Sequence, residues 1–353
     1  MIQELISDAI RLLKQLIATP SLSGEEQGTA HLLQQVLTAK CRDVKRDFNN
    51  VWVKNMHYDE RKPTILIQSH HDTVRPNAGY TLDPYLPLMD GDRLYGLGSN
   101  DAGGSLVSLL ATFLYFYTRT DLHYNLVFAA VGEEETSGKR GIRSLLPVLG
   151  PIDCAIVGEP TNMEMAIAER GLLVLDCEVV GEPGHAGRKE GVNSILKAIP
   201  DIQWFESYQF PKVSSLLGTN TMSVTIINAG IQHNVVPGRC TFTTDVRMNE
   251  CYTPEEVLAI VREHVSCTIT PRSMRLRPSF IAESHVLVKA GKALGREVFG
   301  SPTLSDKALM PFPTLKMGPG DSKRSHSADE FIYLQELEQG IETYIELLKL
   351  VVV

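Results

Sequence analysis

The amino-acid sequence predicts an α/β protein into which a smaller α+β domain is inserted. Three short runs without charged residues (64–67, 125–131 and 154–157) predict strands buried on both faces, as in a sheet that helices cover. Between the first two runs, residues 105–117 are apolar over a length typical of a helix, and strands that alternate with helices are characteristic of this class. The pattern changes after Arg170, where several strands and two helices follow without strongly apolar runs.

The length and charge of the chain narrow the possible functions. A chain of 353 residues favours two domains. The net charge of −8 argues against a general binder of nucleic acid or of anionic membranes. We therefore expect a small molecule as the partner, and neither nucleic acid nor a membrane.

The first helix is expected at residues 1–17, where apolar residues recur at helical spacing with charges between them. That pattern differs from the uninterrupted apolar core of a signal peptide, and no later run is long and uncharged enough to span a bilayer. The six cysteines show no CxxC spacing, which indicates reduced thiols and a cytoplasmic location.

The middle of the chain predicts a ferredoxin-like α+β insert, because two helices lie among several strands there. The expected strands cover residues 172–180, 221–228 and 240–248. The expected helices cover residues 193–204 and 254–265, and Thr253 opens the second of them.

After the insert, a helix from about Ser284, a strand at residues 314–317 and a long final helix complete the main domain. Residues 327–330 (Ser-Ala-Asp-Glu) have the form of a capping box, which predicts that the final helix begins there. The chain is thus divided into a first part of the main domain, the insert and a second part of the main domain, at residues 1–170, 171–282 and 283–353.

Polar side chains with metal-ligand chemistry follow each of the three buried runs. His70 and Asp72 follow the first run, three adjacent glutamates (133–135) follow the second, and Glu159 follows the third. Ligands collect at the carboxyl ends of parallel strands, so these residues are expected at one edge of the sheet. His70 and Asp72 would point the same way on a strand, although a His-x-Asp pair alone is as compatible with a polar turn.

The run of Glu133, Glu134 and Glu135 is the hardest of these signals to explain without a metal. Charge runs normally lie on a solvated face, but this one follows seven uncharged residues at a buried strand end. A divalent cation would relieve the repulsion between the carboxylates. One glutamate would then be a ligand and its neighbour a general base.

Two further candidates lie in glycine-rich loops. Asp101 precedes a helix in the segment GLGSNDAGG, and its two carboxylate oxygens allow it to bridge two cations; an N-terminal helix cap is the alternative. His326 follows the glycines of residues 318–320 and precedes the final helix, in the kind of loop that carries functional residues.

Nine short motifs, taken in order, resemble the M20 family of zinc aminoacylases and peptidases. The branch they resemble most comprises acetylornithine deacetylases and succinyl-diaminopimelate desuccinylases, and the resemblance covers nearly the whole chain. The motifs are SHHD at 69, GSNDAGG at 98, GEEE at 132, GEPT at 158, GHAG at 184, NVVPG at 234, DVR at 245, GPG at 318 and SHSADE at 325. The resemblance implies a zinc-peptidase catalytic domain, with a mixed sheet flanked by helices, that is interrupted by a lid and dimerisation domain.

By this resemblance, two zinc ions would share Asp101 as a bridging ligand. His70 and Glu159 would complete one site, and Glu135 and His326 would complete the other. Cobalt or manganese would also suit such nitrogen and oxygen ligands. The resemblance further implies a cis peptide bond after Asp101.

The resemblance also implies that Glu134 is the general base and that Asp72 supports His70. The triple glutamate leaves a second register open, in which Glu133 is the base and Glu134 the ligand. We favour Glu134 as the base, because Glu133 then stands where the family has an aspartate.

In the insert, the resemblance implies that His185 stabilises the oxyanion, donated across a homodimer. Asn234 and Arg247 would contact the substrate, and Arg247 is suited to a bidentate grip on an α-carboxylate. Taken alone, Gly184-His185 is as compatible with a turn, and Arg247 with a surface salt bridge.

The resembled branch implies a di-zinc amidohydrolase that removes the acyl group from an N-acyl amino acid, with N-acetylornithine in arginine biosynthesis expected first. Open alternatives are N-succinylornithine, N-acetylcitrulline, succinyl-diaminopimelate and dipeptides. An inactive relative that only binds would lack a ligand or the glutamate base, and neither is missing. Lys323 and Arg324 would either face an anionic succinyl group or form a solvated basic pair.

Overall fold

The computed structural model describes residues 1–353, which form two compact units. The first unit comprises Met1–Ile167, Ile281–Phe299 and Ser305–Val353, and the second comprises Ala168–Phe280 and Gly300–Leu304. The second unit therefore contains a short segment, 300–304, that the sequence pattern assigns to the main domain. None of the helices combines the length and the hydrophobicity that a membrane span requires.

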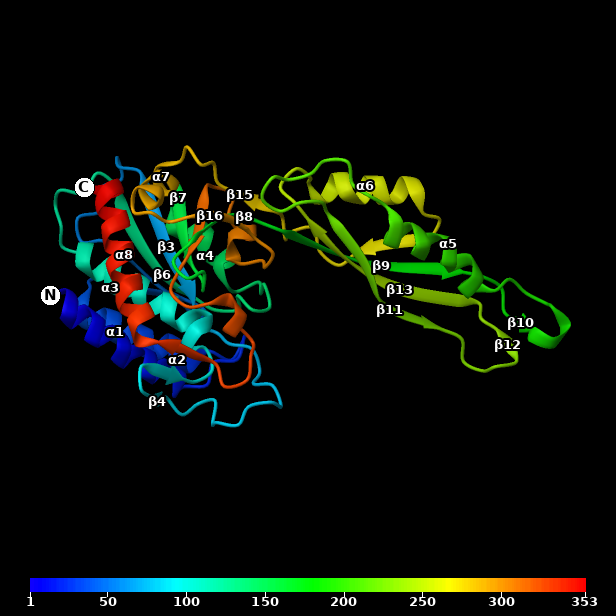
Figure 1. Ribbon diagram of the computed structural model, residues 1–353, viewed down its shortest axis with the longest axis horizontal. Coiled ribbons are helices and arrows are strands. Elements are labelled where there is room, and N and C mark those ends of the chain that lie inside the picture. The colour runs from blue at the N-terminus through cyan, green and yellow to red at the C-terminus, as the bar shows by residue number, and fades with distance from the viewer. The chain divides into compact units, whose positions relative to one another are not determined.

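Four neighbouring parallel strands form the middle of a mixed nine-stranded sheet (Figure 1). In spatial order they are β6 (Asn125–Val131), β3 (Thr64–His70), β7 (Cys154–Gly158) and β17 (Thr314–Met317). Antiparallel strands flank them on both sides. Next to β6 lies β2 (Asn50–Lys54), followed by β1 (Lys45–Asp47). Next to β17 lies β8 (Met165–Glu169), and β8 also pairs with β15 (Ser279–Phe280) and with β16 (Val298–Ser301). The parallel strands all end at the same edge, which is where the candidate ligands follow them.

Helices cover both faces of this sheet. On one face α3 (Gly104–Phe116) packs on β3, β6 and β7, and α1 (Ile2–Ile17) and α8 (Leu334–Val352) pack on α3 (Figure 1). On the other face α4 (Ile142–Leu149) packs on strand residues that include Leu66 and Val127. Every residue of β3, β6 and β7 is buried, as their lack of charge predicts.

Smaller elements complete the first unit. The helix α2 (Gln27–Lys40) packs beside β2, and α7 (Val286–Ala293) packs on α8. A three-stranded sheet has the order β18 (Phe331–Tyr333), β5 (Arg93–Tyr95) and β4 (Leu88–Asp90).

The predicted start of the final helix is wrong. The helix begins at Leu334, and a capping box of Tyr333 and Glu336 closes its first turn. The residues before it are extended because they form β18, which pairs with β5. Glu330 therefore caps no helix, and its buried carboxylate binds the backbone of the loop before α3.

The second unit has the predicted ferredoxin-like topology. Its elements follow one another as strand, helix, strand, strand, helix and strand: β9 (Gly171–Val180), α5 (Ser194–Ser207), β11 (Thr221–Ala229), β13 (Arg239–Met248), α6 (Pro254–His264) and β14 (Thr268–Pro271). The antiparallel sheet has the order β11-β13-β9-β14. Alternate residues of β9, among them Leu173 and Leu175, are buried with Phe205 of α5 and Val257 of α6. Thr253 opens α6, as predicted, and it forms a capping box with Glu256.

Candidate metal centre

The ends of the parallel strands bring the predicted ligands together. His70 is the last residue of β3, Glu135 follows β6, Glu159 follows β7, and His326 lies in the loop after β17. Asp101 lies just before α3. Because parallel strands end at one edge of a sheet, residues far apart in the chain converge there.

The ligand atoms form two groups that share Asp101. His70, Asp101 and Glu159 form one group and Asp101, Glu135 and His326 form the other, with the ligand atoms of each group within 4.8 Å of one another. His70 Nε2 lies 3.3 Å from Asp101 Oδ1, and His326 Nε2 lies 3.6 Å from Asp101 Oδ2. The two oxygens of Asp101 thus face different histidines, as a bridging carboxylate requires.

Asp101 reaches this position because the helix is interrupted there. Residues Ser99–Gly103 form a single wide turn in which Asp101 and Ala102 have non-helical dihedral angles. The peptide bond between these two residues is cis, as the resemblance implies. The regular helix begins only at Gly104.

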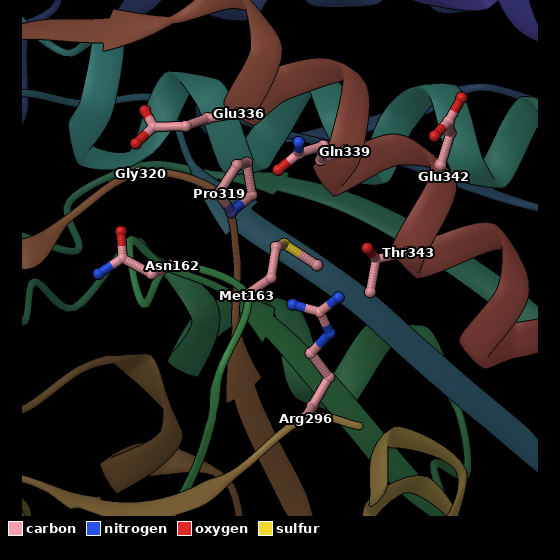
Figure 2. Close-up of a pocket in the computed structure, with 9 residues that line it drawn as sticks. All are labelled: Asn162, Met163, Arg296, Pro319, Gly320, Glu336, Gln339, Glu342 and Thr343. Atoms are coloured by element: carbon pink, nitrogen blue, oxygen red, sulfur yellow. The ribbon is translucent and has the colours of Figure 1, made fainter. Parts of the chain in front are cut away.

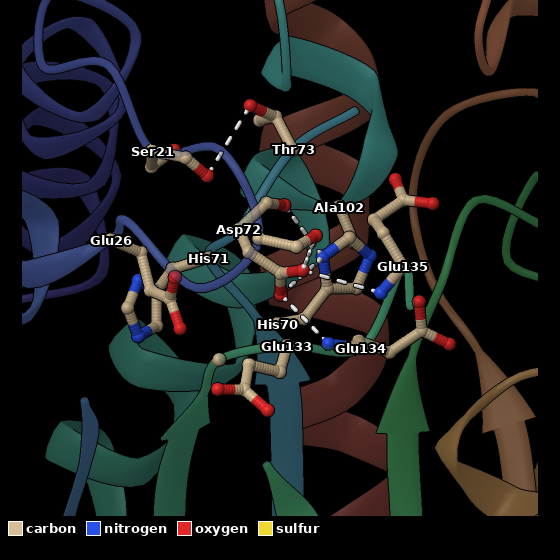
Figure 3. A network of polar contacts seen from close by, with 12 residues as sticks. Ser21, Glu26, His70, His71, Asp72, Thr73, Ala102, Glu133, Glu134 and Glu135 are labelled. Atoms are coloured by element: carbon tan, nitrogen blue, oxygen red, sulfur yellow. Dashed lines mark hydrogen bonds and ion pairs between the residues drawn. The ribbon is translucent and has the colours of Figure 1, made fainter. Parts of the chain in front are cut away.

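Asp72 is a fully buried residue whose carboxylate holds the turn after β6 (Figure 3). Its Oδ1 accepts the backbone N–H of Glu134 at 3.0 Å, and its Oδ2 accepts that of Glu135 at 3.2 Å and the hydroxyl of Ser23 at 2.6 Å. The ring of His70 is held differently, because its Nδ1 lies 2.9 Å from the backbone carbonyl of Asp72 and 3.6 Å from Oδ1. The closest support for His70 therefore comes from the main chain of Asp72.

The three glutamates after β6 have different surroundings (Figure 3). Glu133 has a positive φ of 56°, and its Oε2 accepts the backbone N–H of Arg140 at 3.0 Å. Glu135 belongs to the second ligand group, where its Oε2 lies 3.0 Å from His326 Nε2. This geometry favours the register in which Glu135 is the ligand and Glu134 is the free carboxylate beside it.

Negative charge accumulates around these groups. Burial raises the pKa of Glu134 well above its usual value, and the charges of Glu159, Asp306 and Glu135 add to the effect. Burial and the charge of Asp101 raise the pKa of Glu159 to about 8, although His70 opposes the shift. Buried carboxylates that repel one another in this way are the surroundings that a divalent cation stabilises.

The neighbouring carboxylates also raise the pKa of the two histidines. Burial by itself would lower the pKa of His70, but the hydrogen bond with Asp101 and the surrounding carboxylates raise it well above its usual value. The hydrogen bond with Glu135 raises the pKa of His326 to about 9. Imidazole nitrogens and carboxylate oxygens together form a donor set that fits zinc and similar divalent ions.

The neighbouring His71 lies outside this donor set, as its place on the strand predicts. Its ring is buried between Thr29 Oγ1 at 2.8 Å and the backbone carbonyl of Asn49 at 2.9 Å. Burial lowers the pKa of His71 to about 4, so the ring is neutral.

The other predicted site residues lie in the second unit. His185 is in β10 (Gly184–His185) and pairs with Val235 of β12 (Val235–Val236), next to Asn234. Both His185 and Asn234 are exposed. Arg247 of β13 binds Asp245 through Nε at 2.7 Å and Nη2 at 3.1 Å. The structure thus brings His185 and Asn234 together and gives Arg247 a carboxylate partner within its own strand.

Three buried residues near the ligands were missed in the sequence. Glu330 was interpreted as part of a helix cap. Asp306 and Lys316 are 3% and 4% exposed, and their charges act on Glu134 and Glu159, respectively. The sequence held one signal for Lys316, because it is the only charged residue in the otherwise uncharged strand β17.

Of the basic pair before His326, Arg324 forms an ion pair with Glu336.

A separate cavity of about 380 Å³ lies between α8 and the loop after β17 (Figure 2). Its lining includes Arg296, Gly320 and Glu342 but none of the ligand residues. The candidate site is therefore identified by the convergence of its ligands and not by the size of a cavity.

Comparison with known proteins agrees with this geometry. The chain matches the family model "Peptidase family M20/M25/M40" over residues 66–350. It is 27% identical over 347 residues to the LysW-lysine/LysW-ornithine hydrolase of Sulfurisphaera tokodaii, which covers 95% of this chain and 93% of that protein. It is 26% identical over 277 residues to succinyl-diaminopimelate desuccinylase 2 of a Ruegeria species, and this match covers 73% of this chain and 69% of that protein.

Solved structures show the same fold at lower identity. Aminopeptidase PepT from Bacillus cereus superposes with a TM-score of 0.79 at 17% identity, over 99% of this chain and 98% of that one. The YXEP protein of Bacillus subtilis, described as a dinuclear metal-binding M20 peptidase, superposes with a TM-score of 0.73 at 16% identity, over 98% of each chain. Since the family model spans most of the sequence, this chain belongs to peptidase family M20/M25/M40 and is a metal-dependent amidohydrolase.

Proposed function

We propose that this chain is a di-zinc deacylase that hydrolyses the acyl–nitrogen amide of an N-acyl amino acid, with N-acetylornithine in arginine biosynthesis as the first expected substrate. The observation that carries the proposal is the pair of ligand groups that share Asp101. The names of two relatives refer to lysine, ornithine and diaminopimelate, which are all amino acids with a second amino group. This common feature supports an ornithine-like substrate.

When bound, two zinc ions would polarise the amide carbonyl and lower the pKa of water towards 7. Glu134 would take a proton from the attacking water and return it to the leaving amine. The hydrogen bonds from Glu134 and Glu135 to Asp72 fix the backbone that carries this base. His185 would stabilise the oxyanion, while Asn234 and Arg247 would hold the substrate, with Arg247 exchanging Asp245 for the substrate carboxylate.

Removal of a succinyl group is the second candidate, because several of the relatives are named as succinyl-diaminopimelate desuccinylases. The ion pair between Arg324 and Glu336 leaves Lys323 as the member of the basic pair free to meet a second carboxylate. The two candidates differ in one substrate group, so one panel of substrates separates them.

The test is the release of free amine from acetyl- and succinylornithine, acetylcitrulline, succinyl-diaminopimelate and dipeptides, with zinc or with a chelator. We expect zinc-dependent turnover of an ornithine-type substrate, and its loss in the His326→Ala variant. His31→Ala is the matched control, because His31 is exposed on α2 and binds only Gln35. Turnover that survives complete metal removal would contradict the proposal.

We also infer that the second unit forms a homodimer. The strand β11 is at an edge of its sheet, and it exposes Ile226 and Ile227 at 49% and 54%. Leu196 of the neighbouring α5 is 64% exposed. An apolar edge strand in a folded protein is normally covered, and a second copy of this edge would cover it.

A further inference from the structure

Three backbone N–H groups in the turn that carries Asp101 have no hydrogen-bond acceptor within the turn itself. Gly98 precedes this turn as its N-cap, and Asn100 and Asp101 are among its first residues, so their N–H groups have no preceding helical carbonyl to bind. Asn100 is fully buried and Gly98 is buried as well. Buried N–H groups without a partner destabilise the folded state, so this turn needs an acceptor from elsewhere in the chain.

Glu330 supplies that acceptor for all three groups. Its Oε1 accepts the N–H of Asn100 and of Asp101, both at 2.8 Å, and its Oε2 accepts that of Gly98 at 3.0 Å. The side chain is almost completely buried, since Glu330 is 2% exposed. The backbone carbonyl of Glu330 also accepts the N–H of Gly96 at 2.9 Å, so the residue holds this loop from both its main chain and its side chain.

We propose that Glu330 is a positioning residue for the two-metal site, because its carboxylate fixes the backbone from which Asp101 bridges the two ligand groups. The inference rests on the proposed function. Glu330 follows His326 by four residues, so one loop supplies a ligand directly and also holds the bridging ligand in place. A shift in that loop would therefore change both ligand groups together.

The carboxylate suits this role better than a neutral side chain. Each of its two oxygens accepts at least one of the three N–H groups, whereas an amide side chain has a single oxygen acceptor. A glutamine would offer one oxygen, and its NH₂ group would face at least one of the three donors. The Glu330→Gln variant therefore keeps the shape of the side chain while it disturbs the backbone on either side of Asp101.

The test measures the zinc affinity of Glu330→Gln in competition with a chromophoric chelator, and zinc content by native mass spectrometry. We expect zinc affinity to fall about 10- to 100-fold, the usual effect of losing a partner that orients a ligand. Asp201→Asn is the matched control. Asp201 is a buried carboxylate of the second unit that accepts the N–H groups of Ser266 and Cys267 at 3.0 and 2.9 Å.

The control separates positioning from general damage, because both variants lose a buried carboxylate that binds backbone N–H groups. Weaker zinc binding in Glu330→Gln, with unchanged binding in Asp201→Asn, supports the inference. If the Glu330→Gln and Asp201→Asn variants both bind two zinc ions with wild-type affinity, the positioning role of Glu330 is overturned, while the proposed function is unaffected. A wild-type protein that binds no zinc would instead overturn the proposed function. If Glu330→Gln does not fold, Glu330→Asp, which keeps the charge on a shorter side chain, takes its place under the same criteria.

Discussion

The buried carboxylate of Asp72 accepts the backbone N–H of Glu134 at 3.0 Å, and so ties the turn after β6 to the end of β3. The backbone carbonyl of the same aspartate lies 2.9 Å from His70 Nδ1. One residue therefore orients a proposed zinc ligand through its main chain and the proposed base through its side chain. Such contacts are effective because the low dielectric of the interior strengthens them.

Replacing Asp72 by asparagine should lower kcat about 10- to 100-fold, because an amide NH₂ group would face one of the two N–H groups that the carboxylate now accepts. Zinc binding should persist, since His70 is held by the main chain. Steady-state kinetics and zinc analysis check both expectations. Asp153→Asn is the control, because Asp153 accepts the N–H of Thr64 at the opposite end of β3. An unchanged kcat in the Asp72 variant would show that the carboxylate has no role in orienting Glu134.

Replacing Glu134 by glutamine should lower turnover about 10²- to 10⁴-fold, the usual contribution of a positioned general base. The zinc content should stay at the wild-type value, because Glu134 belongs to neither ligand group. Glu133→Gln is the adjacent control and should keep its activity, since the Glu133 carboxylate binds the backbone of Arg140. The opposite result, with Glu133→Gln inactive and Glu134→Gln depleted of zinc, would establish the alternative register.

The free energy of unfolding of the metal-free protein should fall as the pH rises from 6 to 9. The pKa of Glu159 is raised to about 8 by burial and by Asp101, and that of His326 to about 9 by its hydrogen bond with Glu135. Both values exceed those of the unfolded chain, about 4.3 for glutamate and 6.5 for histidine. The folded state therefore holds protons that the unfolded state has already released, so its stability is lost as the pH rises through these values.

Urea unfolding with a chelator present, at pH 6 and at pH 9, measures this fall. The Glu159→Gln variant should show a smaller one. Saturating zinc should reverse the trend, because the metal binds deprotonated ligands. A metal-free protein that becomes more stable towards pH 9 would contradict the charge distribution described for the site.

Replacing Ile227 by lysine should convert the proposed dimer into a monomer, because it places charges on the exposed edge strand β11. Sedimentation velocity over a range of concentrations measures the change. Leu350→Lys is the control, since Leu350 is 58% exposed on α8 of the first unit. A wild-type protein that sediments as a monomer would remove the basis for the dimer.

The sequence by itself determined the fold class and the donor set of the candidate site. Uncharged runs of four to seven residues predict strands buried between helices, and residues that follow parallel strands are expected to meet at one edge of the sheet. The strand at residues 125–131 has the predicted bounds for this reason, and the strand at residues 314–317 also has them although it contains Lys316. His70, Asp101, Glu135, Glu159 and His326 form the two expected groups.

The tertiary structure alone decided how those ligands are held. Glu330 contacts Gly98 across 232 residues of sequence, and Asp72 contacts Glu134 across 62. No local pattern distinguishes Glu330 from a helix cap, because its role depends on which unpaired N–H groups lie opposite it once the chain has folded. The surroundings of Glu133, Glu134 and Glu135 differ for the same reason, because three identical side chains acquire different partners only when the turn that carries them is folded against Asp72, Arg140 and His326.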